Sequence, residues 1–172
     1  MSEQTVQIGE LLRSYEARTG RLLTIGTAES ATGGRVSDQI TDTPGSSHYF
    51  RGAVVAYRND VKMALLGVKS ETIETHGAVS AETAIEMARG GRRLLGVDIC
   101  LSDTGIAGPA GATPEKPVGL FYLGLAAGDA SLTEKHIFTG DREENKRAAV
   151  QAALTMLKEF LSKYVSAEPT PE

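Results

Sequence analysis

Cysteine and aromatic residues are scarce in this sequence, and each scarcity excludes a class of protein. Cys100 is the only cysteine, so the chain cannot form an internal disulfide, as expected of a protein in the reducing cytoplasm. Cys100 lies in the apolar run 97–101, and we interpret it as a small buried side chain rather than a reactive thiol. Aromatic residues make up 5% and are not interleaved with basic residues, which argues against stacking on single-stranded nucleic acid.

The sequence also lacks long apolar runs and an excess of basic charge. No segment approaches the roughly 20 apolar residues that a membrane-spanning helix needs. The first residues show neither the basic nor the apolar region of a secretion signal. The net charge is −4, so we expect no surface that binds nucleic acid by charge alone. These absences favour a cytoplasmic protein with no direct nucleic-acid or membrane partner.

What is present indicates one globular domain. The 172 residues include 41% hydrophobic and 23% charged residues, which is typical of a compact domain with a full core. We find no internal repeat or linker. We therefore predict one domain over residues 1–165, followed by a disordered polar tail over residues 166–172.

The periodicity of the sequence predicts an α/β fold. Apolar runs predict strands at 22–27, 51–57, 97–101, 118–126 and 132–138. Helical spacing and capping residues predict helices at 8–15, 35–40, 59–66, 81–95 and from Asp141 onward. Strands alternate with helices early and two strands are adjacent late. This order predicts a three-layer α/β/α fold with a mixed central sheet of about five strands.

The first candidate site is the strand-to-helix turn at residues 27–34. Gly33 and Gly34 would let backbone amides approach a ligand, and a helix start offers unpaired N–H groups to a phosphate or an oxyanion. The same turn could expose the Ser30 hydroxyl. The alternative is a plain helix cap by Ser30 or Thr32. Glu29 is unusual in a buried turn and favours a site.

A serine needs a base to become a nucleophile at neutral pH. No obvious aspartate partner is spaced near any of the three histidines, His48, His76 and His136. Lys62 follows Tyr57 and could serve if its environment lowers its pKa. The alternative is that Lys62 is an ordinary solvated helix lysine.

Two later segments could hold a ligand. The glycine-rich stretch after the third strand contains Thr104, Gly105, Ala107 and Gly108, and ligands bind at the carboxyl ends of strands in α/β sheets. A flexible surface loop is the alternative. Arg142, at the start of the last helix, could hold a phosphate or carboxylate, or lie on the surface. No His/Cys/Asp/Glu cluster has metal-ligand spacing, so we expect neither a metal nor a cofactor.

Taken in order, these segments resemble the C-terminal domain of the competence/damage-inducible protein CinA, a domain also found alone in PncC-type nicotinamide-nucleotide amidases. The resemblance runs from about Leu11 to Leu161. It rests on residues 27–34, 44–47, 57–59, 62, 66–68, 76–80, 105–109, 116–119 and 140–142.

The resemblance implies metal-independent hydrolysis of nicotinamide mononucleotide to nicotinic acid mononucleotide and ammonia. In it, Ser30 matches the nucleophile, Lys62 the general base and Tyr57 an assisting residue. Thr104 and Arg142 match substrate-binding positions.

We add the hypothesis that the amides of Thr32, Gly33 and Gly34 stabilise the oxyanion, beside Glu29. A small-molecule pyridine nucleotide is then the partner, and a homodimer is plausible for the family.

Two residues depart from the family pattern. Ala31 stands where many relatives have Cys, and Arg58 where Ser is frequent. Neither change removes a proposed catalytic group. The N-terminal domain of the larger CinA proteins is not expected here, nor is its activity. Two alternatives stay open: a nucleotide-binding or interaction module linked to competence or DNA damage without amidase activity, and an amidase for another small amide.

Overall fold

The computed structural model describes residues 2–166 of the chain. Its helices are α1 (Glu3–Thr19), α2 (Arg35–Thr41), α3 (Asn59–Leu66), α4 (Ser70–His76), α5 (Ala81–Leu95) and α6 (Arg142–Ser166), with a short 3-10 helix, η1 (Ser46–His48). Its strands are β1 (Ile25–Glu29), β2 (Phe50–Val55), β3 (Ile99–Gly105), β4 (Leu120–Ala127) and β5 (Ala130–Ile137).

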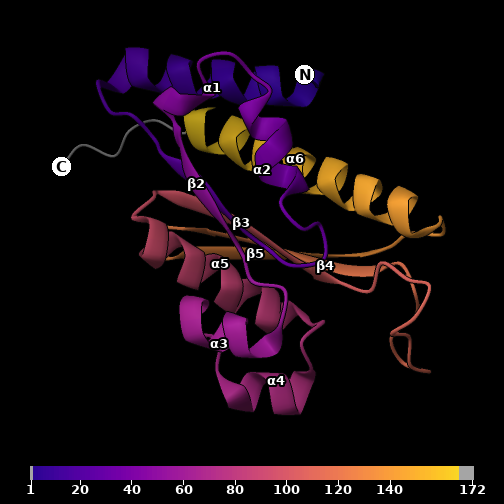
Figure 1. Cartoon of the computed structure of the whole chain (residues 1–172). Helices are drawn as coiled ribbons and strands as arrows, with labels where there is room; N and C mark the ends of the chain where they lie inside the picture. The colour runs from indigo at the N-terminus through magenta and orange to yellow at the C-terminus, as the bar shows by residue number, and fades with distance from the viewer. Residues whose placement is uncertain (1, 167–172) are drawn as a thin grey trace.

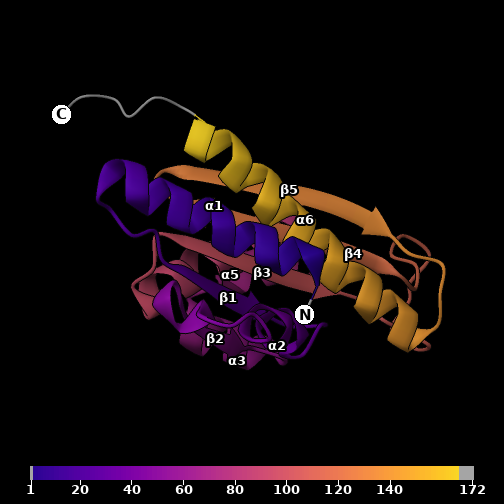
Figure 2. The ribbon, with the colours of Figure 1, turned by 90° about the horizontal axis from the view of Figure 1, so that it is seen from above.

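The five strands form one mixed sheet between two layers of helices. The strand order is β2-β1-β3-β4-β5. β1 pairs in parallel with β2 and β3, whereas β3–β4 and β4–β5 are antiparallel. Figure 1 shows α1, α2 and α6 over one face and α3, α4 and α5 over the other, and Figure 2 shows α1 and α6 side by side. The predicted three-layer α/β/α fold is confirmed.

Each face of the sheet has its own apolar core. The larger core joins the sheet to α1 and α6, and it includes an apolar stripe on α6 formed by Val150, Leu154, Leu157 and Leu161. The smaller core joins the sheet to α3 and α5 and contains Cys100. Burial raises the pKa of the Cys100 thiol to about 12, which suits a buried hydrophobic side chain rather than a nucleophile.

Two adjacent glycines let α5 lie very close to its neighbours. A Cβ atom added to Gly90 would stand 1.8 Å from the Leu66 carbonyl oxygen of α3. One added to Gly91 would stand 2.7 Å from Cys100 Sγ and 2.9 Å from Ala28 Cβ. Any side chain here would push α5 off the sheet and off α3. The two glycines therefore fix where α3, which carries Lys62, sits relative to β1 and β3.

The strand boundaries differ from the prediction at the end where the site lies. β1 continues through Glu29 and β3 through Gly105, beyond the apolar runs that predicted them. The polar residues that end these strands are buried, because local amides and hydroxyls satisfy them. Helix α4 was not predicted, since it contributes little apolar surface. Side chains cap the two helices α5 and α6: Ser80 Oγ accepts from the Thr83 amide, and Asp141 and Glu144 bond reciprocally.

The predicted tail begins inside the last helix. Ser166 is the final residue of α6, and the rest of that segment lies outside the described residues. Within residues 2–166, no helix is long and apolar enough to cross a membrane.

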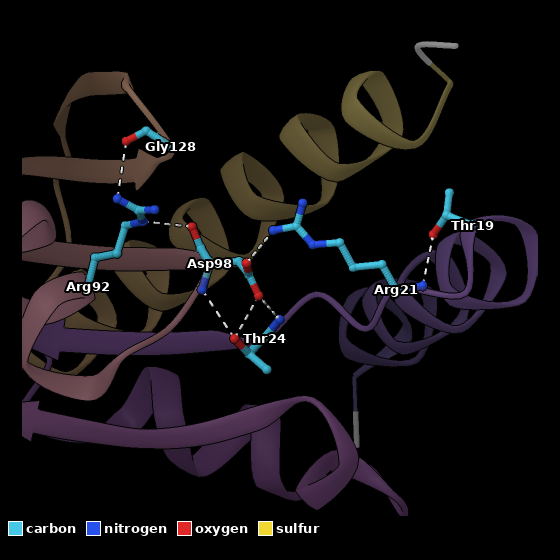
Figure 3. A network of polar contacts seen from close by, with 6 residues as sticks. All are labelled: Thr19, Arg21, Thr24, Arg92, Asp98 and Gly128. Atoms are coloured by element: carbon cyan, nitrogen blue, oxygen red, sulfur yellow. Dashed lines mark hydrogen bonds and ion pairs between the residues drawn. The ribbon is translucent and has the colours of Figure 1, made fainter. Parts of the chain in front are cut away.

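The candidate site lies at the carboxyl ends of the parallel strands. At their amino ends, Asp98 joins the starts of β1 and β3 (Figure 3). Its carboxylate accepts from the Thr24 amide and hydroxyl, each at 2.8 Å, and from the Arg21 guanidinium at 2.7 Å. Arg92 donates to the Asp98 carbonyl at 2.9 Å. Burial alone would raise the pKa of Asp98, but the Thr24 and Arg21 hydrogen bonds outweigh it and hold this pKa below its usual value.

Asp98→Ala should lower the free energy of unfolding by about 1–3 kcal/mol, because it leaves the Thr24 amide and hydroxyl without their acceptor. Since the folded-state pKa is depressed, the stabilisation is present above the pKa of an unfolded aspartate and is lost as pH falls through the folded value. Urea unfolding at pH 7 and at pH 3 measures both effects. Arg21→Ala is the control and should cost at most about 1 kcal/mol, because it removes only an exposed ion pair. Equal losses in the two variants would contradict this account.

Candidate active site

Ser30 and Lys62 meet in the interior of the protein. Ser30 is the first residue after β1, and Lys62 lies on α3, which follows the neighbouring strand β2. Lys62 Nζ lies 2.8 Å from Ser30 Oγ, and only 2% of the Lys62 surface is exposed. Lys62 is therefore not the solvated helix lysine that the sequence left open.

The other two partners of Lys62 are groups that can only accept hydrogen bonds. Its Nζ lies 2.9 Å from the Ala56 carbonyl oxygen and 3.0 Å from the Tyr57 carbonyl oxygen. A neutral amine has two N–H groups and one lone pair. If the two N–H groups donate to these carbonyls, the lone pair faces the Ser30 hydroxyl, which is the arrangement a general base requires.

Burial favours the neutral form of this amine. It lowers the pKa of Lys62 from the ordinary lysine value, while the negative charge of Asp103 acts in the opposite direction. The pair can therefore exchange a proton more readily than an exposed serine and lysine.

Glu29 is a structural anchor of the serine turn. It is 1% exposed, and its carboxylate accepts from the amides of Gly34, Val36 and Ser37 at 2.8–3.1 Å. These amides form the first turn of α2, whose N-cap Gly34 has a φ of 96° and no side-chain cap of its own. The carboxylate thus replaces the cap that Ser30 or Thr32 was considered to supply. These hydrogen bonds turn the Glu29 oxygens toward the protein, and contact between Glu29 and substrate stays a prediction.

The predicted oxyanion site does not hold for two of its three amides. The Thr32 amide donates to Asp103 Oδ1 at 3.0 Å, and the Gly34 amide donates to Glu29 Oε2 at 2.8 Å. Both N–H groups point at carboxylates, so neither is free for an oxyanion. Gly33 is the member of the trio whose amide donates to neither carboxylate. The Lys146 ammonium lies 3.5 Å from where a Cβ atom on Gly33 would stand, so a cation approaches this part of the turn.

The sequence analysis missed Asp103, which is 1% exposed on β3. Its Oδ2 accepts from the Ser30 amide at 3.1 Å and lies 2.5 Å from Thr32 Oγ1. Burial and the charge of Glu29 raise the pKa of Asp103 to about 6, although the Thr32 hydrogen bonds oppose the rise. One sequence signal could have identified Asp103. The polar stretch 102–104 directly follows an apolar strand, and the other candidate residues also lie at the carboxyl ends of strands.

Tyr57 links the serine–lysine pair to a cavity. Its carbonyl contacts Lys62, while its exposed hydroxyl accepts from Arg142 Nη2 at 3.0 Å. Arg142 Nη1 donates to the Gly108 carbonyl at 2.6 Å. Arg142 also lines a cavity of about 520 Å³. The cavity is bounded by Ala107, Gly108, Pro109, Val118, Gly140, Asp141, Arg142 and Glu143.

Thr104 and Gly105 hold the edge of this region together. The Thr104 hydroxyl donates to the Ala78 carbonyl at 2.7 Å, so that its proton is already used within the protein. A Cβ atom on Gly105 would stand 2.4 Å from the Phe121 ring, so the glycine is needed for packing. Ala107 is buried, and its carbonyl accepts from Asn145, a fully buried residue that sequence reasoning also missed.

The structure thus brings the predicted residues together in two groups. Ser30 and Lys62 form the first, and Tyr57, Arg142 and Gly108 form the second. Among residues 2–166, no three His, Cys, Asp or Glu side chains are grouped so as to hold a metal ion.

These features define an α/β protein that holds a buried serine–lysine pair at the carboxyl ends of its parallel strands. A family model described as the CinA C-terminal domain matches residues 10–161, and the chain belongs to that family.

Relatives support the assignment. The chain is 52% identical over 156 residues to a putative competence-damage inducible protein of Halothermothrix orenii, covering 90% of this chain and 36% of that protein. It is 45% identical over 141 residues to a CinA-like protein of Thermotoga maritima, covering 82% of this chain and 34% of that one. The chain therefore spans about a third of the length of the curated relatives it matches.

Solved structures agree in fold. A competence/damage inducible protein of Agrobacterium tumefaciens superposes with a TM-score of 0.84 at 35% identity, over 94% of this chain and 97% of that chain. Competence damage-inducible protein A of Klebsiella pneumoniae gives a TM-score of 0.84 at 30% identity, over 94% and 98%.

The geometry predicts that Ser30 is reactive and that Lys62 makes it so. A serine-directed fluorophosphonate should label Ser30, and Lys62→Met should slow labelling by about a hundredfold or more, because the base is lost. Mass spectrometry of the labelled peptide measures the rate. Lys69→Met, at an exposed lysine, is the matched control and should label normally. Labelling of the Ser30→Ala variant, or an unchanged labelling rate in the Lys62→Met variant, would contradict the assignment.

Proposed function

We propose that this protein is a nicotinamide-nucleotide amidase that hydrolyses nicotinamide mononucleotide to nicotinic acid mononucleotide and ammonia. The observation that carries the proposal is the buried Lys62 amine, held by two acceptor-only carbonyls with its third position at Ser30 Oγ. This is the arrangement for nucleophilic attack on an unreactive carbonyl.

The proposed mechanism has two halves. Ser30 Oγ bonds to the carboxamide carbon while its proton passes to Lys62 Nζ. Lys62 then returns that proton to the amide nitrogen and the carbon–nitrogen bond breaks. Ammonia departs, and the acyl group remains bound to Ser30 as an ester. Water attacks the ester carbon with Lys62 as base, and collapse of that intermediate releases the carboxylic acid and restores the Ser30 hydroxyl. Nucleophile and base both come from the chain, so no metal ion is required.

The Arg142 cavity suits the nucleotide part of the substrate. Arg142 presents a guanidinium beside the main chain of the 107–109 loop, and guanidinium groups bind phosphate by paired hydrogen bonds. Tyr57 connects this cavity to the base, since one residue contacts both Lys62 and Arg142. A substrate with an anionic group at one end and a carboxamide at the other would match the two groups of residues.

The names of the relatives point to a second candidate, a binding module that acts in competence or the response to damage. A module that only binds gains nothing from a buried lysine aimed at a serine, whereas burial of the amine has an energetic cost. We therefore place the amidase first. The single buried cysteine is consistent with the proposal of a cytoplasmic location.

Ser30→Ala should abolish ammonia release from nicotinamide mononucleotide, because no ester can form. Coupled glutamate dehydrogenase measures the ammonia, and circular dichroism checks that the variant is folded. Chelator should leave the wild-type rate unchanged. Tight nucleotide binding with no ammonia from the wild-type chain would instead favour the binding module.

Arg142→Gln should raise the KM for nicotinamide mononucleotide by about 10- to 100-fold, as expected for a lost hydrogen bond to a charged group. The same variant should leave the slower hydrolysis of nicotinamide riboside unchanged, because the riboside has no phosphate. Steady-state kinetics on both substrates separates the two effects. Equal use of nucleotide and riboside by the wild-type chain would overturn the phosphate-binding role of Arg142.

A further inference from the structure

The Thr32 hydroxyl lies between two buried carboxyl groups. Thr32 Oγ1 is 2.7 Å from Glu29 Oε2 and 2.5 Å from Asp103 Oδ2, and all three residues are at most 1% exposed. A hydroxyl has one proton and can donate only one hydrogen bond. If both carboxyl groups were ionised, one of these two short contacts would have no proton in it. The geometry therefore requires a second proton on one of the carboxyl groups.

The hydrogen bonds around Glu29 are those of an ionised carboxylate. Besides Thr32, it accepts from three backbone amides and from the Thr27 hydroxyl. A protonated Glu29 would lose part of this acceptor capacity.

Asp103 has fewer donors: the amides of Ser30 and Thr32. Burial and the nearby charge of Glu29 raise its pKa to about 6, so Asp103 keeps its proton to a higher pH than an ordinary aspartate does. The chain of donors then runs from the Asp103 carboxyl to Thr32 Oγ1, and from Thr32 Oγ1 to Glu29.

The titratable groups that act on Asp103 are Glu29 on β1 and Lys62 on α3. An anionic Asp103 would stabilise the charged form of Lys62, and a neutral Asp103 would not. The protons of Asp103 and Lys62 are therefore coupled. Asp103 also holds the Ser30 amide, so it fixes the main chain that carries the nucleophile.

We propose that Asp103 carries the proton shared through Thr32 with Glu29, and that it acts as a positioning residue which orients the Ser30 turn and sets the pH at which Lys62 becomes a base. This inference rests on the proposed Ser30–Lys62 chemistry. It assigns Asp103 no contact with substrate.

Asp103→Asn is the central test, because an amide is neutral at every pH. Its nitrogen can donate to Thr32 Oγ1 as the acid does, but it cannot accept from the Ser30 amide as Asp103 Oδ2 does. Because the Ser30 amide loses its acceptor, the variant should label more slowly with fluorophosphonate, so the readout is the position of its pH profile and not its maximal rate. The rising part of its profile of labelling rate against pH should move to lower pH, because the anion that favours the charged form of Lys62 can no longer form. A profile that stays in place or moves to higher pH would overturn the coupling.

Thr32→Val and Thr32→Ser test the bridge itself. Valine has nearly the same shape without the hydroxyl, so it should slow Ser30 labelling and alter its pH profile. Serine restores the hydroxyl and should restore both. If Thr32→Val matches the wild type in rate and profile, the bridge has no part in positioning Ser30.

Carbon-13 NMR of the Asp103 carboxyl group gives a readout that needs neither labelling nor amidase activity. In the intact wild-type chain, with Asp103→Asn to assign the signal, Asp103 should stay neutral well above the pH at which an ordinary aspartate ionises. Titration at the ordinary value would overturn the shared proton. Failure of Ser30 to label in the wild type would instead count against the proposed function, and the NMR titration would still decide where the proton lies.

Discussion

The site depends on one constraint: a lysine amine is buried where it can bond to one serine and two carbonyl groups. Removing an amine from water is unfavourable unless it is paired or neutral. The fold meets this constraint by bringing main-chain oxygens from the start of the β2–α3 connection to Lys62, so that a neutral amine has every hydrogen bond satisfied. The close packing of α5 at Gly90 and Gly91 holds α3 in the required place.

The serine turn follows from a second pair of buried polar residues. Glu29 caps α2 from the end of β1, and Asp103 reaches across from β3 to the amides of Ser30 and Thr32. The turn is thus fixed by carboxyl groups on two adjacent parallel strands, and Gly34 supplies the left-handed backbone that the helix start needs. Acidic residues close to a basic catalytic group oppose its deprotonation. Protonation of one of them would reduce that conflict, and this ties the architecture of the turn to the chemistry of Lys62.

Much of the fold and part of the site could be predicted from the sequence. The strand and helix order followed from apolar periodicity, and the resemblance to the family named Ser30 and Lys62 before their contact was known. The roles of Glu29 and Asp103 could not be predicted, because they depend on where backbone amides point after β1 and β3 pair. The oxyanion hypothesis does not hold for two of its three amides for the same reason: glycines at a helix start indicate available amides, but Glu29 and Asp103 already occupy the amides of Gly34 and Thr32.

In the proposed function, Tyr57 would keep substrate binding and chemistry separate. It contacts Lys62 through its main-chain carbonyl and Arg142 through its side chain. Because the first contact is independent of the side chain, the cavity can vary at position 57 without removing an acceptor from the base. The second contact leaves the Arg142 guanidinium held by neutral oxygens of Tyr57 and Gly108 rather than by a carboxylate. Neutral partners are weaker competitors for a guanidinium than an anionic ligand is. An incoming phosphate could therefore take over the Arg142 hydrogen bonds while the main-chain contact that supports Lys62 stays in place.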